Sequence, residues 1–316
     1  MEKLLEVKDL KVSFFTDLGE TQAVKDAGFA IEEGDFFGIV GESGSGTTKS
    51  ILRLGPSNCR IMGGEILFQG EDILKKSEAE LREIRGGEIA MIFQDSLSAL
   101  NPVYTVGNKM VELIRRHTSM TKKEAKARVL ELLTAVGITD PEKAMRSYPH
   151  ELSGGMRQRV MIAMAMSSNP KVLIADEPTT ALDVTIQAQI LHLLLELQKK
   201  NNMSIILITH DLGVVAQTCK RVAVMCGGYV VEEGTVEEIF LNPGHPYTQA
   251  LIASMPRVGG TFEQFLERDL SDGSGNLCPF LNRCKYADKT CEACLPKYYE
   301  SSENHKILCH RREEEK

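Results

Sequence analysis

Short apolar runs separated by turn residues dominate the first seventy residues of the chain. The runs at 4–7, 12–15 and 29–31 predict antiparallel strands. The continuous run at 36–40 predicts a strand that is buried on both faces. Further along the chain, the same reasoning predicts strands at residues 64–70, 89–93, 172–175 and 205–208.

Helical periodicity is clearest at residues 121–136. Thr121 and Glu124 have the spacing of a capping box, and Gly137 fits the C-terminal stop. Other helices are predicted at 48–54, from Ser153 onward and at 185–200. Because strands alternate with helices, we predict an α/β fold with a parallel sheet covered by helices on its faces.

Composition changes this interpretation mainly at the C-terminus. The chain has 316 residues, enough for one large domain and an appendage. After Pro256 the periodic pattern gives way to glycine, polar residues and cysteine. We therefore predict one domain over residues 1–257 and a separate Cys-rich extension over residues 258–316.

Charge and hydropathy exclude some classes of protein. The net charge of -7 disfavours a nucleic-acid binder that relies on a general positive field. No apolar run approaches the ~20 residues that a membrane helix needs, and the first residues do not resemble a signal peptide. We expect a cytosolic chain whose membrane role would depend on partner subunits.

The strand at 36–40 leads into a Gly-rich segment that fits a phosphate-binding loop. Backbone N–H groups of such a loop and of the following helix bind phosphate, in the pattern G-x-x-x-x-G-K-[ST]. The candidate phosphate-binding residues are Gly41, Ser43, Gly44, Ser45, Gly46, Thr47 and Thr48. Thr48 occupies the position that reaches Mg²⁺, whereas Thr47 stands where the motif has lysine. A Gly-rich turn without a ligand is the alternative.

The strand at 172–175 ends in two acids. In a nucleotide site, Asp176 would hold Mg²⁺ and Glu177 would polarise the attacking water, although two solvated acids at a strand end are the simpler alternative. Ser153, Gly154 and Gly155 open a helix whose exposed N–H groups form a second anion-binding N-terminus. A plain helix cap would need only the serine.

Together these motifs resemble the nucleotide-binding domain of ABC transporters. The resemblance implies a Q-loop at Gln94, a D-loop at 181–183 that ends in Asp183, and a switch histidine at His210. It places Phe14 against the adenine ring, with Phe15 as the alternative, and adds Gln94 to the Mg²⁺ ligands. Glu177, His210 and Gln94 are therefore the candidate catalytic residues, and ATP with Mg²⁺ is the expected cofactor.

The resemblance also implies an architecture. The expected fold is a P-loop NTPase of the ABC type, with an antiparallel β edge and a helical insertion at about 108–150. Two such domains face each other head to tail in this family. Ser153, Gly154 and Gly155 would therefore act on the nucleotide of the partner ATPase.

Three further segments narrow the resemblance to ATPases of oligopeptide, dipeptide and nickel importers. These segments are residues 95–107, 244–251 and 278–284. The resemblance implies a second ATPase subunit, by family analogy a paralogue, two transmembrane permease subunits and an extracytoplasmic peptide-binding protein. It places the chain at the cytoplasmic face of the membrane as a peripheral subunit.

Five of the eight cysteines lie near the C-terminus. In this family such cysteines can hold a [4Fe–4S] cluster, and the resemblance selects Cys278, Cys284, Cys291 and Cys309, with Cys294 as the alternative ligand. A four-cysteine zinc site and reduced free thiols are the alternatives.

The missing lysine is the main departure from the family. Lysine donates charge-assisted hydrogen bonds to the phosphates, each contributing ~1.5–3 kcal/mol, and a threonine hydroxyl is neutral and short. Lys49 comes two residues later, so on a helix it would point about 200° away from the position that the motif lysine occupies. We expect either an importer ATPase with an impaired phosphate loop or a non-hydrolysing scaffold subunit. The alternative alignment, in which the loop is shortened before Thr48, stays open.

Overall fold

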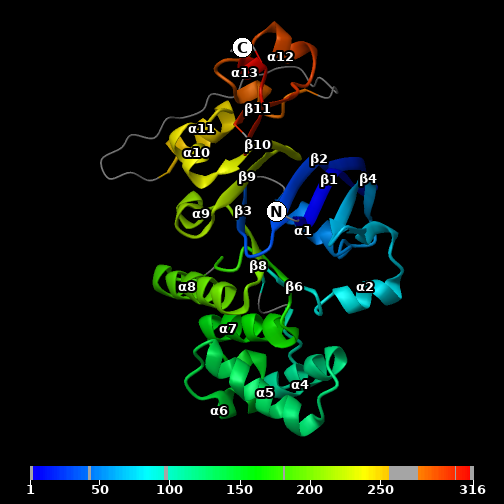
Figure 1. Cartoon of the computed structure of the whole chain (residues 1–316), viewed down its shortest axis with the longest axis vertical. Helices are drawn as coiled ribbons and strands as arrows, with labels where there is room; N and C mark the ends of the chain where they lie inside the picture. Colours follow the sequence, from blue (N-terminus) through cyan, green and yellow to red (C-terminus); the bar gives the residue numbers. More distant parts are fainter. Residues whose placement is uncertain are drawn as a thin grey trace.

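The computed structural model describes residues 3–41, 44–95, 99–180, 182–255, 277–302 and 304–313. Along the longest axis of the molecule, a group of helices lies at one end and the C-terminal segment at the other (Figure 1). The sheet lies between them, and the N-terminal strands project to one side of it (Figure 1). In the described ranges, no helix is both long enough and apolar enough to span a membrane.

Parallel strands form the centre of the sheet. In spatial order they are β9 (Arg221–Cys226), β3 (Phe36–Gly41), β8 (Ser204–Thr209), β7 (Val172–Asp176) and β6 (Ile89–Ile92). Nearly all their side chains are buried, which confirms the strands predicted from continuous apolar runs.

The sheet continues through β10 (Tyr229–Thr235), which pairs antiparallel with β9 and parallel with β2 (Gly19–Glu32), into a group of antiparallel strands. β1 (Lys3–Thr16) lies between β2 and β4 (Cys59–Phe68), and β5 (Glu71–Asp72) follows β4. The two runs predicted at 4–7 and 12–15 are therefore one strand. Register shifts between Val7 and Val12 absorb the polar residues that separate the two runs in the sequence.

Helices cover both faces of the parallel strands. They are α1 (Gly44–Ile51), α2 (Glu78–Ile84), α7 (Gly154–Ala165), α8 (Val184–Asn201), α9 (Leu212–Thr218), α10 (Val236–Leu241) and α11 (Pro246–Ala253). Short 3-10 turns occupy Ile73–Lys75, Pro149–Glu151, Met166–Ser168 and Leu281–Arg283. α1 starts earlier than the predicted helix at 48–54, because the Gly-rich segment itself forms its first turn.

Three helices form the insertion that leads into α7. They are α4 (Val106–His117), α5 (Lys122–Ala135) and α6 (Pro141–Arg146) (Figure 1). The predicted capping box of α5 is confirmed, since the Thr121 side chain accepts from Glu124 N and the Glu124 side chain accepts from Thr121 N. The apolar face of α5 joins a core that continues through α7 and α8 to the sheet.

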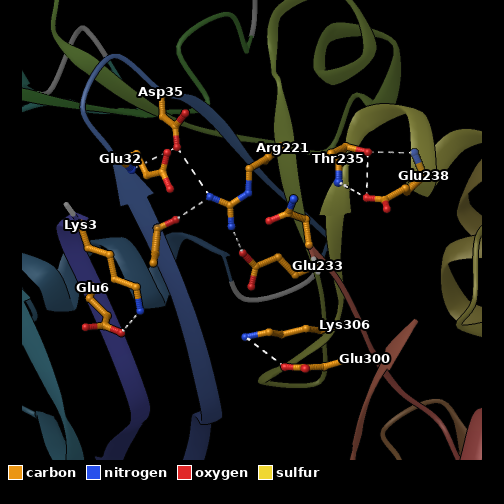
Figure 2. A network of polar contacts seen from close by, with 12 residues as sticks. Lys3, Glu6, Glu32, Asp35, Arg221, Glu233, Thr235, Glu238, Glu300 and Lys306 are labelled. Atoms are coloured by element: carbon orange, nitrogen blue, oxygen red, sulfur yellow. Dashed lines mark hydrogen bonds and ion pairs between the residues drawn. The ribbon is translucent and has the colours of Figure 1, made fainter. Parts of the chain in front are cut away.

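An arginine joins several strands where the parallel and antiparallel parts meet. Arg221 on β9 lies 2.5 Å from Glu233 on β10 and 3.6 Å from Asp35 (Figure 2). It also donates to the backbone oxygen of Ala30 on β2. Burial raises the pKa of Glu233, against the lowering effect of Arg221. This network holds the start of β3, and hence the phosphate loop that follows it, in register with the sheet.

The C-terminal segment docks onto the same sheet. It contains α12 (Lys289–Ala293), β11 (Tyr298–Ser302), β12 (His305–Leu308) and α13 (His310–Glu313). β12 pairs with β10 in antiparallel fashion, at Ile307 opposite Glu232 and at Lys306 opposite Glu233. The predicted domain boundary after residue 257 lies outside the described residues and stays a prediction.

Candidate functional site

The Glu177 carboxylate is the meeting point of three loops at the C-terminal edge of the parallel strands. Gln94, after β6, donates to Glu177 Oε2 at 2.7 Å. His210, after β8, places Nδ1 3.3 Å from Glu177 Oε1. Thr180 donates to Glu177 Oε2 at 2.8 Å. Three residues separated by up to 116 positions, the candidates Gln94, Glu177 and His210, therefore lie together.

The backbone at Glu177 is strained. Its φ of 45° lies in the left-handed region that non-glycine residues rarely adopt, and its N–H donates to Ile208 O at 2.9 Å. Strained backbone persists where the surrounding structure fixes it, and such positions gather at functional sites. Asp176, the last residue of β7, is fully buried just before it.

The phosphate loop runs from the end of β3 into α1. Gly41 has a φ of +109°, and a Cβ there would lie 2.1 Å from Met225 O, so the chain approaches β9 too closely for a side chain. Ser43 lies outside the described residues, and Gly44 and Ser45 are described by their backbone alone. Gly46 and Thr48 follow in the first turns of α1, with Thr48 fully buried.

These residues suit Mg²⁺ and a nucleotide. The hydroxyl of Thr48, the carboxamide of Gln94 and the carboxylate of Asp176 are oxygen donors of the kind Mg²⁺ prefers. The helix N-terminus beside them offers backbone N–H groups to phosphate. The three oxygen donors and the N-terminus of α1, which follows Gly41, therefore fit ATP with Mg²⁺, the cofactor expected from the sequence.

Thr47, at the position of the motif lysine, and Lys49, two residues later, contact different parts of the structure. Thr47 is fully buried, and its hydroxyl contacts the sulfur of Met225 at 3.6 Å. The prediction that Lys49 points away from the position of the motif lysine stays a prediction. The Lys49 Nζ lies 3.5 Å from Asp176 Oδ2 at the end of β7.

The helix start at Ser153 lies beside the loop before α8. Ser153 caps α7 by accepting from Met156 N, and Asp183 caps α8 by accepting from Ile186 N. A Cβ on Gly155 would lie 3.1 Å from Ile186, and one on Gly154 would lie 3.7 Å from Leu182.

These residues and Arg159 line an open hollow of about 780 Å³. Ala181 of the predicted D-loop lies outside the described residues.

The two candidate adenine-stacking residues have different surroundings. Phe14 and Phe15 are consecutive in β1, so their side chains point to opposite faces. Phe14 packs against the hydrophobic core of the antiparallel strands, whereas the Phe15 ring lies 5.0 Å from the Arg60 guanidinium. The assignment of Phe14 to adenine stays a prediction.

The predicted iron–sulfur site is not supported. Cys278, Cys284, Cys291 and Cys309 do line one cavity, but that cavity is only about 20 Å³, the room of a single water. Within the described ranges, no group of three or more His, Cys, Asp or Glu side chains is placed to hold a metal ion, which applies to zinc as well.

Two contacts were missed by reasoning from the sequence. Thr180 lies in the segment between Glu177 and Asp183, but no motif position pointed to its hydrogen bond with Glu177. Helical geometry assigned Lys49 away from the position of the motif lysine, and its contact with Asp176 was not predicted. A signal was present for both, since each lies within three residues of a predicted site residue.

Comparison with known families agrees with the geometry. The family model described as "ABC transporter" matches residues 24–180, and "Oligopeptide/dipeptide transporter, C-terminal region" matches residues 231–291. The oligopeptide transport ATP-binding protein OppD of Bacillus subtilis is 55% identical over 84% of this chain and 75% of its own length. The dipeptide transport ATP-binding protein DppD of the same organism is 48% identical over 98% and 95%.

Solved structures agree with the fold. The dimeric ATP-binding cassette MJ0796, bound to ADP and phosphate in a post-hydrolysis state, matches with a TM-score of 0.65 and 28% identity over 73% of this chain and 98% of its own. The cbiO1 subunit of an ABC transporter complex from Clostridium perfringens matches with a TM-score of 0.64 at 28% identity, over 81% and 96%. The chain therefore belongs to the ABC ATPase family, among the ATP-binding subunits of peptide transporters, which hydrolyse ATP.

Proposed function

We propose that this chain is the ATP-binding subunit of an importer for oligopeptides or dipeptides. It would couple ATP binding and hydrolysis to transport through partner membrane subunits. The observation that carries the proposal is the convergence of Gln94, Thr180 and His210 on the strained Glu177. A scaffold protein does not require a carboxylate held in this way, whereas water activation does.

Each site residue has a role that follows from its position. Thr48, Gln94 and the buried Asp176 would hold Mg²⁺. The metal would supply positive charge that neutralises the phosphates. Glu177 would accept a hydrogen bond from the attacking water and orient it in line with the γ-phosphate. His210, whose side chain is 72% exposed, is accessible to the same nucleotide.

The partner ATPase would complete the site. The hollow at Ser153, Gly154, Gly155 and Asp183 opens on the surface, and the Ser153 end offers backbone N–H groups to an anion. We infer that this hollow closes on the nucleotide of a second ATPase subunit, a paralogue by analogy with the family. Closure on ATP and opening after hydrolysis would then move the membrane subunits.

A second surface suits the membrane subunits. Phe93, 39% exposed and next to Gln94, lines a groove of about 250 Å³ with Leu100, Leu113 and Met164. A contact there would transmit movement at Gln94 to the permease. Two permease subunits, an extracytoplasmic peptide-binding protein and a peripheral position at the cytoplasmic face of the membrane complete the proposal.

We infer that Thr47 impairs this chain's own hydrolysis, because its buried hydroxyl contacts Met225 and carries no charge. The test is Mg-ATP binding and phosphate release by the full chain and by Thr47→Lys, with Thr47→Met as the uncharged control. We expect wild type to bind ATP and turn over slowly. Thr47→Lys should raise turnover roughly 100-fold, and Thr47→Met should not.

The same experiment distinguishes the scaffold alternative, which the inward-facing Thr47 favours. If neither wild type nor Thr47→Lys binds ATP, the loop is unable to cradle phosphate and the chain acts as a non-hydrolysing scaffold. Binding without any gain from Thr47→Lys would show that the missing lysine is not what limits turnover.

A further inference from the structure

Lys49 brings a positive charge to the nucleotide edge of the sheet. It lies on α1, one residue after Thr48, and its Nζ is 3.5 Å from Asp176 Oδ2. The Lys49 side chain is 39% exposed, whereas that of Asp176 is 1% exposed. The partly exposed lysine therefore reaches a buried carboxylate from the solvent side.

The two threonines before Lys49 cannot supply this charge. Thr47 and Thr48 are both fully buried and neutral, and the Thr47 hydroxyl is directed at Met225. Lys49 forms an ion pair with Asp176. An ammonium group on a flexible stem has three donors and can exchange one oxygen partner for another at little cost in geometry.

We propose that Lys49, two residues after the position of the motif lysine, is the cation that binds the phosphates of ATP at this site, and that it supports binding without restoring the turnover that Thr47 impairs. The proposal rests on the proposed ATP-binding function. Without nucleotide, Lys49 pairs with Asp176. With Mg-ATP bound, Asp176 would hold the metal, and the Lys49 ammonium would donate charge-assisted hydrogen bonds to the β- and γ-phosphate oxygens.

The opposing arrangement is a lysine that stays on Asp176 and excludes the metal. Two cations beside one buried carboxylate repel each other, so the metal binds well only if the lysine has another acceptor. The phosphate oxygens are such an acceptor. The two arrangements predict opposite effects of removing the charge, because removal weakens nucleotide binding in the first and strengthens Mg²⁺ binding in the second.

The test compares the full chain with Lys49→Met and Lys49→Gln, using a fluorescent ATP analogue displaced by ATP, ADP or AMP. Each titration is run with Mg²⁺ and with EDTA. Lys199→Met on α8 is the matched control, since Lys199 is exposed. We expect both Lys49 variants to bind ATP and ADP roughly 10- to 100-fold more weakly in both conditions, with AMP unchanged. Lys49→Arg should recover part of the loss.

Three outcomes would overturn the proposal. Unchanged ATP affinity in Lys49→Met, with wild type binding normally, would remove Lys49 from the phosphate site and leave the proposed function intact. A gain in Mg²⁺-dependent binding would identify Lys49 as a competitor of the metal. Wild type that binds no ATP would contradict the proposed function itself and this inference with it. Thermal unfolding of each variant shows whether a loss of binding reflects a loss of folding.

Discussion

Glu177 and Glu232 are each paired with a histidine, yet their surroundings differ. Glu177 has a side chain that is 23% exposed and lies 3.3 Å from His210. Glu232 on β10 is fully buried and lies 2.7 Å from His305 of the C-terminal hairpin. The Glu177 carboxylate accepts hydrogen bonds from the side chains of Gln94 and Thr180, which lie in loops that follow strands. The Glu232 carboxylate accepts hydrogen bonds from the backbone N–H groups of Gly244 and His245.

The difference separates a group placed for chemistry from a group placed for folding. Glu177 keeps access to solvent and has a strained backbone, so its carboxylate can meet a water and a nucleotide. Glu232 is sealed on all sides, so its contacts serve to attach β12 and the segment at 244–245 to the sheet. The same side-chain types therefore carry different roles, and the degree of burial decides between them.

The largest effect is expected at the buried glutamate. Glu232→Gln removes the charge and leaves buried N–H donors with a poorer acceptor, which should lower the free energy of unfolding by about 3 kcal/mol. Urea unfolding measures this. Glu300→Gln, at an exposed position of β11, is the control and should change little. ATP turnover per folded molecule should stay as in wild type. A stable Glu232→Gln protein would show that the pair does not hold the C-terminal hairpin.

The same substitution at the partly exposed Glu177 should change ATP turnover and leave stability unchanged. Glu177→Gln should lower ATP turnover by about 100- to 1,000-fold, because the group that orients the water is lost, with nucleotide binding and unfolding unchanged. The readout is phosphate release in the Thr47→Lys background, where turnover is higher. Glu196→Gln on α8 is the control, since its side chain is 65% exposed. Equal turnover in both variants would contradict the assignment of Glu177.

A smaller, pH-dependent effect is expected beside Glu232. Burial lowers the pKa of His245 to about 4 from the ordinary 6.5, although Glu232 acts in the opposite direction. The unfolded chain therefore takes up the proton first as the pH falls. Stability is fully present above about pH 6.5 and is lost as the pH falls toward 4, by on the order of 3 kcal/mol at most.

His245→Asn should reduce this loss at low pH. Asparagine can still accept the hydrogen bond from Tyr247 N that caps α11, and it does not titrate. Thermal unfolding between pH 7 and pH 4 measures the change. His192→Asn, at a side chain that is 73% exposed, is the control and should keep the wild-type pH dependence. An unchanged pH dependence in His245→Asn would assign the acid sensitivity to other groups.

Much of the fold could be predicted because local patterns agree with it. The buried run of β3, the capping box of Thr121 and the apolar face of α5 were all readable, since each depends on neighbours within one element. The sequence did not predict that two of the expected strands form the single strand β1, because this depends on pairing with β2 and β4 across register shifts. The start of α1 was missed for a related reason, since glycine favours no single conformation.

The candidate site shows the same division. The sequence by itself determined the family, the order of the motifs and the absence of lysine at position 47, because residue types at fixed spacing carry that information. Only the tertiary structure decided that Lys49 contacts Asp176, that Thr180 donates to Glu177, and that Cys278, Cys284, Cys291 and Cys309 line one small cavity. These contacts join side chains on separate elements, and their distances depend on how the elements pack.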